Sequence, residues 1–588
     1  MGLTLGLLAA GCLDGDSDLP AFNTARASID LWSRTYGYSD AIHQFDISES
    51  LQATIPSEDG GFLAIGFRRC AFESVDLNCH ANGQTREPRI WAVKVNDDGS
   101  QILWEKAFSG FKGSMGVRAI KGNSVAPGPT GETYIIAGID RFTPPGLTGN
   151  PRLRILQLDY LGNVLSDTVF APPVQGDEYE QVIPMKIIRG IDSDGRESGW
   201  LIVGYAIVDE PNLGANAAYK NRGFMLALED DLSVRFFRAV DRGLLVDPND
   251  PLSVTSDEQF YSVTTLDNRY VVAGLTETGT VGDSFGVRPL IAVYTPDGAL
   301  ERAVIHTNFE DPSPGCRGLF AVDIHNDPAN GLYLLLNDNY RLGTQDFSFD
   351  CADPSFYIAR LAEADLSPQT ITRYHYDFQD PSPVAPRIHG ASEFDFLSND
   401  QIAVTTHHNY LLNEYGPLLE HDWSDASVNL IALDGTVVRQ LDYGGYATHD
   451  TIRELQQLPD GRCLLTGSTD LVTEPSLYSS PDFDPVFGAG LTFSRPQDGW
   501  LAMDRCDDPI TFTTANIATG PYPLLSGYFI SLPGADPSAT IELLLSSEPV
   551  VATAEPIELP DLKIPENPVT PPPSVIDAIS SPIQTFYP

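Results

Sequence analysis

Histidine is the side chain in this sequence that is best suited to chemistry, and most of the histidines gather in one part of the chain. Six of the ten lie between residues 375 and 449: His375, His389, His407, His408, His421 and His449. An imidazole transfers protons near neutral pH and binds transition metals. If the fold brings His389, His407, His408 and His449 together, they form a metal or proton-transfer site. The interpretation that we favour is a scatter of histidines over long surface loops.

Three carboxylates form a second candidate group, because they occupy equivalent places in a repeated pattern. Glu49, Asp257 and Asp450 each stand thirteen residues before a repeated position described below. Carboxylates repeated around one opening could bind Ca²⁺, a hard cation that prefers oxygen ligands. We favour a structural role, in which each side chain caps a turn or accepts a hydrogen bond from a neighbouring backbone. The calcium-like stretches NDDG (96–99) and DSDG (192–195) lack the rest of a calcium-binding loop, so we expect hairpin turns there.

Two common catalytic signatures are missing from the sequence. It contains no H-E-x-x-H and no Walker motif. We therefore assign no catalytic residue and predict no cofactor, with Ca²⁺ as the one metal considered. An enzyme whose site is assembled from several repeats needs no local motif, and it is our second hypothesis.

A repeated element that runs through most of the chain must position these candidates. A turn containing Asp, Asn or Gly is followed by one anchor residue, a run of apolar residues and often Gly, as in DGGFLAIG (59–66) and DNRYVVAG (267–274). A short, continuously apolar run after a tight turn is typical of a strand buried on both faces. Seven copies occur, and their anchors are Phe62, Tyr134, Trp200, Tyr270, Tyr333, Ile402 and Cys463.

A hairpin with alternating outer residues follows the apolar strand, for example WAVKVNDDGSQILWEKAF (91–108). With one strand before each anchor, every unit has four antiparallel strands. Seven such units predict an all-β fold, a seven-bladed β-propeller with long loops between second and third strands. LWSRTYG (31–37) matches the fourth strand LWEKAFSG (103–110), so we predict that the N-terminal strand closes the last blade. The alternative is ITFTTANI (510–517).

These phrases resemble the repeats of bacterial secreted and surface β-propeller proteins, described as delta-60 or SBBP-type repeats. The resemblance covers about residues 29–508 and is best in units 1 and 4. It is poorest in units 5 and 6, where Asn337 and Thr406 replace the glycine. The family implies a propeller outside the cytoplasm and offers no shared catalytic residues to transfer.

The N-terminal stretch MGLTLGLLAAGC (1–12) resembles the signal of a bacterial lipoprotein, in which small residues precede a lipidated cysteine, here Cys12. No basic residue precedes the apolar run, which a secretory signal usually has, and an ordinary buried N-terminus is the alternative. Residues 13–28 would then form an acidic tether. Leu13 after the cysteine favours the outer membrane or cell surface by the same resemblance.

Six further cysteines make an even number, as expected in an oxidising compartment. No C-x₂-C spacing suggests zinc. Neighbours in sequence give the pairs we expect, although fifteen pairings are formally open. The expected pairs are Cys70–Cys79, Cys316–Cys351 and Cys463–Cys506.

The amino-acid composition limits the classes of partner that we expect the protein to bind. The 80 acidic against 36 basic residues give a formal charge of −44, which disfavours nucleic acid and anionic membrane surfaces. After the propeller, 509–548 is expected to add a small β segment, and the proline content of 549–588 predicts an extended tail. We expect a monomeric lipoprotein of the cell envelope that binds a protein or a glycan. Aromatic residues in the loops of blades 6 and 7 (407–427 and 468–497) suit sugar stacking.

Overall fold

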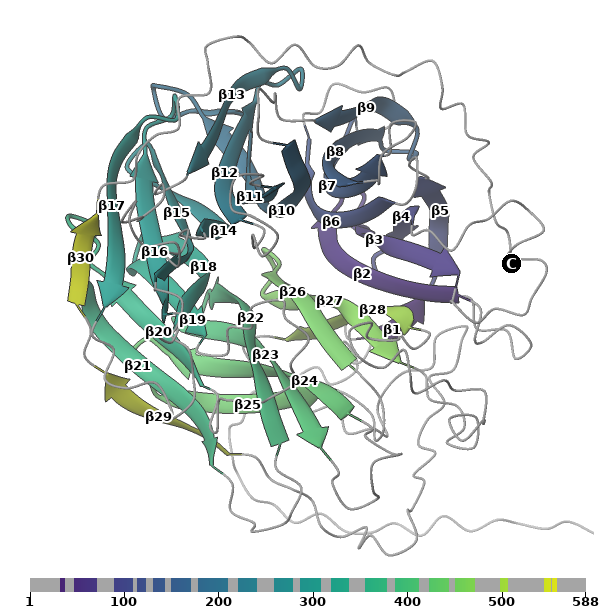
Figure 1. Cartoon of the computed structure of the whole chain (residues 1–588). Coiled ribbons are helices and arrows are strands. Elements are labelled where there is room, and N and C mark those ends of the chain that lie inside the picture. Colours follow the sequence, from purple (N-terminus) through teal and green to yellow (C-terminus); the bar gives the residue numbers. More distant parts are fainter. Residues whose placement is uncertain are drawn as a thin grey trace, which may run out of the picture.

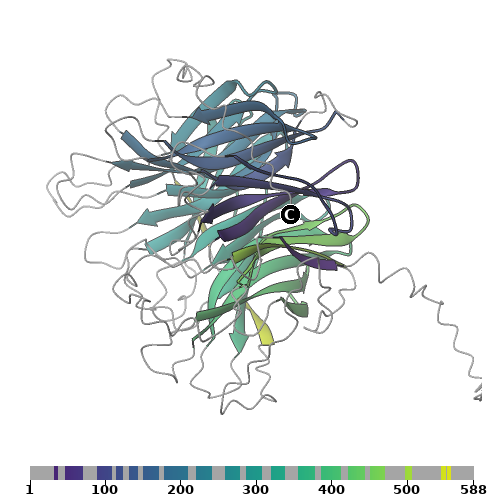
Figure 2. The ribbon, with the colours of Figure 1, turned by 90° about the vertical axis from the view of Figure 1, so that its right-hand side faces the viewer.

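The apolar runs that follow the repeated turns form the second strands of seven antiparallel sheets, which stand around a common centre as the blades of a β-propeller (Figure 1). This architecture, in the computed structural model of the chain, confirms the all-β fold and the seven blades. Figure 2 shows the ring from the side. The structure describes residues 32–36, 47–70, 89–108, 114–122, 131–142, 150–170, 178–209, 220–240, 258–278, 286–307, 319–337, 355–377, 386–411, 422–443, 450–470, 497–505, 544–550 and 553–557.

Each blade is numbered from its innermost strand outwards. Blade 1 consists of β2 (Ile47–Pro56), β3 (Phe62–Cys70), β4 (Arg89–Val95) and β5 (Ile102–Phe108). Blade 2 consists of β6 (Ser114–Lys121), β7 (Thr133–Phe142), β8 (Asn150–Asp159) and β9 (Val164–Phe170). Blade 3 consists of β10 (Glu178–Ile191), β11 (Glu197–Asp209), β12 (Lys220–Leu228) and β13 (Val234–Val240).

Blade 4 consists of β14 (Glu258–Leu266), β15 (Arg269–Thr278), β16 (Gly286–Tyr294) and β17 (Leu300–Thr307). Blade 5 consists of β18 (Phe320–Asp327), β19 (Gly331–Asn337), β20 (Phe356–Leu361) and β21 (Pro368–Asp377). Blade 6 consists of β22 (Pro386–Leu397), β23 (Gln401–Leu411), β24 (Asp422–Ala432) and β25 (Val437–Tyr443). Blade 7 has β26 (Asp450–Gln457), β27 (Arg462–Asp470) and β28 (Gln497–Arg505).

The fourth strand of blade 7 comes from the other end of the chain. β1 (Trp32–Tyr36) pairs antiparallel with β28, with Arg34 opposite Leu501. The predicted closure by the N-terminal strand is confirmed, while the alternative segment 510–517 lies outside the described residues. No helix in the described part of the chain has the length and apolarity needed to cross a membrane.

Two strands beyond the propeller sequence extend its outer rim. β29 (Leu544–Val550) pairs with β21 of blade 5, and β30 (Thr553–Ile557) pairs with β17 of blade 4. Both blades thereby become five-stranded, and Figure 1 shows the added strands at the edge of the ring. A β appendage was expected within 509–548, but strand pairing continues to Ile557, inside the range expected to be an extended tail.

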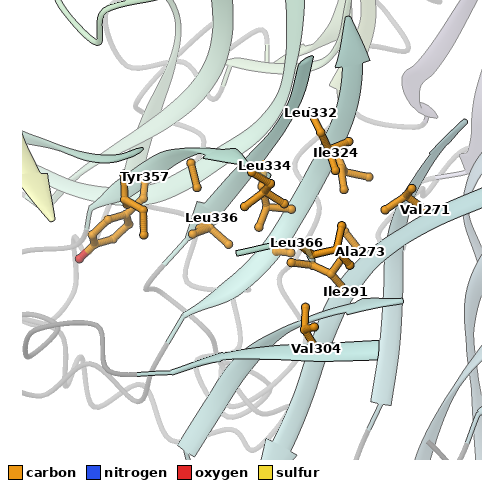
Figure 3. Packing of buried hydrophobic residues seen from close by; sticks show 14 of the residues in the cluster. Val271, Ala273, Ile291, Val304, Ile324, Leu332, Leu334, Leu336, Tyr357 and Leu366 are labelled. Carbon is orange, nitrogen blue, oxygen red and sulfur yellow. The ribbon is translucent and has the colours of Figure 1, made fainter. Parts of the chain in front are cut away.

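Hydrophobic side chains fill every interface between neighbouring blades. Seven clusters of buried residues each combine one blade with the next. Figure 3 shows the cluster between blades 4 and 5, where Val271 and Ile291 face Ile324 and Leu334. Strands buried on both faces carry uninterrupted apolar runs, which explains why the repeats read as they do.

Hydrogen bonds near the tight turns tie the outer strands of one blade to the next. A side chain of a fourth strand donates to the carbonyl of a turn in the following blade at several interfaces. The bonds run from Tyr36 to Gly99, Trp104 to Tyr160, Arg238 to Gly298, Arg302 to Glu363 and Tyr374 to Gly435, at 2.6 to 3.2 Å. Tyr36 lies in the closing strand, so this strand completes the circle of bonds in the same way as the others.

The repeated glycine has a steric reason. At Gly66, Gly204, Gly274 and Gly467, a Cβ atom would lie 1.7 to 2.0 Å from a backbone carbonyl oxygen of the innermost strand. Only a residue without a side chain allows this close approach. The second strand therefore packs against an irregular stretch of the first.

The pairing in blade 5 corrects one detail of the repeat alignment. Leu336 pairs with Ala321, as Gly274 pairs with Phe260 in blade 4. Leu336 rather than Asn337 therefore stands at the glycine position, and Leu332 rather than Tyr333 is equivalent to the other anchors. The one-residue offset arises because Tyr333 is also buried, at 4% exposure, so the apolar pattern alone does not fix the register.

We predict that Gly274→Ala destabilises the protein by about 3 kcal/mol, because its Cβ would lie 1.8 Å from Gln259 O and the backbone would have to shift. The control is Gly461→Ala, where nothing lies within 4 Å and only the positive φ of +85° is unfavourable. That change should cost about 1–2 kcal/mol. Denaturant unfolding of the two variants measures the difference, and equal losses would contradict the steric explanation.

Candidate functional site

The innermost strands surround the central channel, and each carries a β-bulge at the same place. The register skips one residue in every one of the seven strands. We call these skipped residues the channel residues: Gln52, Val117, Met185, Tyr261, Val322, Ser392 and Arg453. The residues that follow them are the ring residues: Ala53, Arg118, Lys186, Ser262, Asp323, Glu393 and Glu454. Five of the seven ring residues are therefore ionisable.

The ring residues join each blade to the next through the backbone. At four successive interfaces a ring side chain accepts the N–H of the residue that follows the next ring residue. The bonds are Ser262 Oγ with Ile324 N (3.2 Å), Asp323 Oδ2 with Phe394 N (3.3 Å), Glu393 Oε2 with Leu455 N (3.4 Å) and Glu454 Oε2 with Thr54 N (2.5 Å). They satisfy backbone groups that the inner edge of a sheet leaves unpaired.

Arg118 connects blades 2 and 3 in the opposite sense. Its Nε donates to the carbonyl of Met185 at 2.7 Å, and its Nη1 donates to the carbonyl of Val117 at 3.1 Å. Acceptors and donors of the ring are therefore both engaged with backbone, and the ring residues have a structural role in the first place.

Asp323 is the centre of the charged group in the channel. Its Oδ1 accepts from Lys186 Nζ at 2.6 Å and from Ser262 Oγ at 2.5 Å, and its Oδ2 lies 3.2 Å from His325 Nε2. Lys186 and Asp323 belong to blades 3 and 5, so their ion pair spans blade 4. The Asp323 side chain is buried, and its oxygens have protein partners on every side.

Charge holds Asp323 and Lys186 ionised. Burial opposes ionisation of Asp323, but the charges and hydrogen bonds of Lys186 and His325 outweigh it and lower its pKa. Burial likewise opposes the charge on Lys186, whereas Asp323 and Glu393 outweigh it and raise the lysine pKa. The pair is thus a buried salt bridge with its remaining hydrogen bonds satisfied, the case in which such a pair is tolerated.

Burial has the opposite result for the two glutamates of the ring. It raises the pKa of Glu393 well above its usual value, with Glu454 and Asp323 adding to the effect. It raises the pKa of Glu454 from 4.5 to about 7, although the Thr54 N–H and the charges of Arg118 and Lys186 oppose the shift. These side chains therefore have less negative charge near neutral pH than ordinary glutamates.

His325 and Asp395 are the accessible members of the group. His325 Nδ1 lies 4.0 Å from Asp395 Oδ1, and their side chains are 27% and 29% exposed. Asp395 also accepts the Gln457 N–H at 3.4 Å, so it too joins two blades. Among the residues that the structure describes, no three His, Cys, Asp or Glu side chains are arranged to hold a metal ion.

A second polar group lies between blades 1 and 2 on the side of the tight turns. Lys94, fully buried, donates to Asp59 Oδ1 at 3.1 Å and to Tyr134 Oη at 3.2 Å. Glu132 accepts from Ser57 at 2.6 Å. Burial opposes ionisation of Asp59, but hydrogen bonds from Tyr160, Gly61 and Lys94 lower its pKa to about 2. The group fastens two blades together through the anchor Tyr134.

Two of the predicted channel-mouth carboxylates, Glu49 and Asp450, lie near the beginnings of innermost strands rather than in the ring. Glu49 pairs with Arg68, and Asp450, the first residue of β26, pairs with Thr469. Each precedes its ring residue by four positions. Their side chains, and the whole of Asp257, lie outside the described part of the structure, so the predicted convergence stays a prediction.

Three of the predicted histidines share one pair of strands. His389 is skipped at a bulge between Ile388 and Gly390, which pair with His408 and His407. The backbone thus places the three histidines side by side, although their side chains are not described, and His449 lies outside the described residues. The expected loop 407–427 is shorter than predicted, because β23 and β24 extend into it and pair Tyr410 with Trp423.

The predicted turns at 96–99 and 192–195 are confirmed as hairpin turns. Gly99 N donates to Asn96 O at 3.1 Å, and Asp192 Oδ1 accepts the N–H groups of Asp194 and Arg196, both at 2.9 Å. The Asp192 carboxylate therefore stabilises a turn.

Of the cysteines, Cys463 is buried in β27 and takes part in a disulfide. Its partner lies outside the part of the chain whose side chains are described. Cys506 lies outside the described residues, so the predicted pairing of Cys463 with Cys506 stays a prediction. Cys12, Cys79, Cys316 and Cys351 are not among the described residues.

Sequence reasoning located the innermost strands but missed the ring. The signal was present, because one or two charged residues interrupt the apolar strands in AVDIH (321–325), SEFDF (392–396) and TIREL (451–455). A charged residue inside a buried strand needs a partner, and in a ring of repeats the partner lies on another blade.

No protein-family model matches this chain, and no curated protein is detectably similar to it in sequence. The geometry of the channel therefore has to be interpreted by itself.

We predict that Glu454→Gln stabilises the protein above neutral pH. A pKa that is raised on folding, here from 4.5 to about 7, contributes stability below pH 4.5 that is lost as the pH rises through 7. The variant should match the wild type near pH 4.5 and exceed it by up to about 3 kcal/mol at pH 8. Glu363→Gln on an exposed turn is the control, with no difference at either pH. Denaturant unfolding at both pH values tests this, and an effect independent of pH would contradict it.

Proposed function

We propose that the chain is a non-enzymatic binding or scaffold module of the bacterial cell envelope, held there as a monomer by a lipid on Cys12. It recognises a protein or a glycan with one face of its propeller. The difference between the two faces is the observation that carries this proposal.

On one face the strands are joined by short turns with internal hydrogen bonds. The turns at 57–61, 159–163 and 192–196 each close with two backbone bonds between 2.8 and 3.0 Å. On the opposite face the connections between second and third strands are much longer. β3 ends at Cys70 and β4 begins at Arg89, and β27 ends at Asp470 while β28 begins at Gln497. Long connections on a rigid scaffold are where binding residues concentrate.

The channel supports a binding function more than a catalytic one. Ring carboxylates that accept backbone N–H groups from a neighbouring blade cannot move away from these donors without weakening the ring. A catalytic acid or base must come within hydrogen-bond reach of the substrate. Asp323, Glu393 and Glu454 are engaged in this structural way, which argues against their use in catalysis.

An enzyme is the competing function, and one observation favours it. His325 and Asp395 lie 4.0 Å apart in the channel and keep about a quarter of their side chains exposed, at 27% and 29%. This pair would be the acid and base of a reaction in the channel. Turnover of an envelope glycan that disappears in His325→Ala would establish that function in place of the one we propose.

The envelope location rests on the sequence. The stretch that ends at Cys12 resembles a lipoprotein signal, and the even number of remaining cysteines suits an oxidising compartment. A charge of −44 would keep such a protein away from anionic lipid headgroups, so the lipid would be its only attachment to the membrane.

We predict that the face with long connections contacts the ligand. A photo-crosslinking amino acid at Tyr415 or Tyr478, in the connections of blades 6 and 7, should give a discrete adduct with an envelope protein or glycan in intact cells. The matched control is the same amino acid at Leu161, which is 51% exposed in a tight turn of the other face. Equal adducts from both faces, or none from either, would refute the proposed binding face.

We predict that Cys12→Ala releases the protein from the membrane. The wild type should enter the detergent phase on phase partition and the variant should remain in the aqueous phase, because acyl chains supply the attachment. Ser17→Ala is the control, since it changes a residue of the same N-terminal stretch and leaves Cys12 in place. Unchanged partition of the Cys12 variant would disprove the anchor.

A further inference from the structure

Arg453 carries a positive charge and takes no part in the hydrogen bonds and ion pairs described for the ring residues. It is the channel residue of blade 7, skipped in the register between Ile452 and Glu454. The side chains of the other six channel residues are half-buried, whereas that of Arg453 is exposed. A side chain of an innermost strand that stays exposed between a buried and a half-buried neighbour projects into the channel.

The guanidinium of Arg453 forms no hydrogen bond or ion pair with any residue that the structure describes. The ring carboxylates of blades 7 and 6 are engaged elsewhere, because Glu454 accepts from Thr54 of blade 1 and Glu393 accepts from Leu455, two residues after Arg453. Arg118, in contrast, donates to the carbonyls of Met185 and Val117.

The electrostatic surroundings of Arg453 are those of an unneutralised cation. Solvent reaches the Arg453 side chain, but the strands that enclose the channel partly desolvate its guanidinium and lower its pKa, and the like charge of Arg118 lowers it further. The raised pKa values of Glu393 and Glu454 reduce the negative charge on this side of the ring. Two guanidinium groups therefore face each other's charge in an otherwise strongly acidic protein.

The polar channel residues form one continuous sector. Going around the ring, Ser392, Arg453 and Gln52 follow one another on blades 6, 7 and 1, and Arg118 comes next on blade 2. Ser392 Oγ donates to Ile452 O at 3.3 Å, next to Arg453 in sequence. The channel residues of blades 2 to 5 are Val117, Met185, Tyr261 and Val322. The amide of Gln52 donates to Ser50 Oγ at 2.8 Å, so the guanidinium of Arg453 is the donor of this sector that no described residue engages.

We propose that this sector binds a small oxyanion, a phosphate or carboxylate group, at the guanidinium of Arg453. Guanidinium groups bind such anions through paired N–H bonds. The enclosing strands limit the ligand to a small molecule or to a single anionic group that enters the channel. The proposed anion site is separate from the face that carries the long connections between second and third strands.

The test compares anion binding by three full-length proteins at constant, low ionic strength. The probes are inorganic phosphate, sulfate and citrate, and titration calorimetry measures the affinity. The wild type should bind at least one of them, and Arg453→Gln should bind it at least tenfold more weakly. Arg196→Gln makes the same change in charge at an exposed position of the β10–β11 turn and should bind like the wild type.

Thermal unfolding without anion controls for folding. Because Arg453 bonds to none of the described residues, its replacement should leave the midpoint unchanged, so a lost affinity reports the site itself. Three results would overturn the proposal: no binding of any probe by the wild type, undiminished binding by Arg453→Gln, or an equal loss in Arg196→Gln. None of these results bears on crosslinking at Tyr415 or Tyr478. The proposed anion site and the proposed binding face can therefore fail separately.

Discussion

The unpaired inner edge of each blade is the constraint on which the rest of this ring depends. An innermost strand pairs with only one neighbour, and its bulge frees further backbone groups at the channel. Ring side chains satisfy these groups across the interface, as Glu454 does for Thr54 and Asp323 does for Phe394. The apolar layers between blades supply the burial, while these bonds fix how each blade is rotated against the next.

This constraint also explains the unusual charges of the channel. A side chain long enough to reach the next backbone must be polar, and several polar side chains then meet in one confined space. The protein balances them by pairing Lys186 with Asp323 and by letting Glu393 and Glu454 hold protons more readily. What looks like a catalytic cluster is thus mainly a set of interblade bonds, and Arg453 is notable because it lies outside that set.

The sequence was sufficient for the fold because each repeat records local structure. Turn, anchor and apolar run are contiguous, and the match between residues 31–37 and 103–110 was enough to place the closing strand. The ring residues could not be recognised from the sequence in the same way. Its residues lie from 8 positions before an anchor, as Ser262 before Tyr270, to 16 positions before it, as Arg118 before Tyr134. Their partners lie on other blades, about sixty residues away or more, where no local pattern records them.

The two ends of the chain are built into the ring at different places, which bears on when the protein can fold. Blade 7 needs Trp32–Tyr36 from the start of the chain and Gln497–Arg505 from near its end, and blades 4 and 5 receive β30 and β29 later still. A complete ring therefore cannot exist while the polypeptide is being delivered. Contacts so distant in sequence form slowly. If the chain is exported, this order keeps it open during passage and lets the ring close only after the whole propeller sequence has arrived.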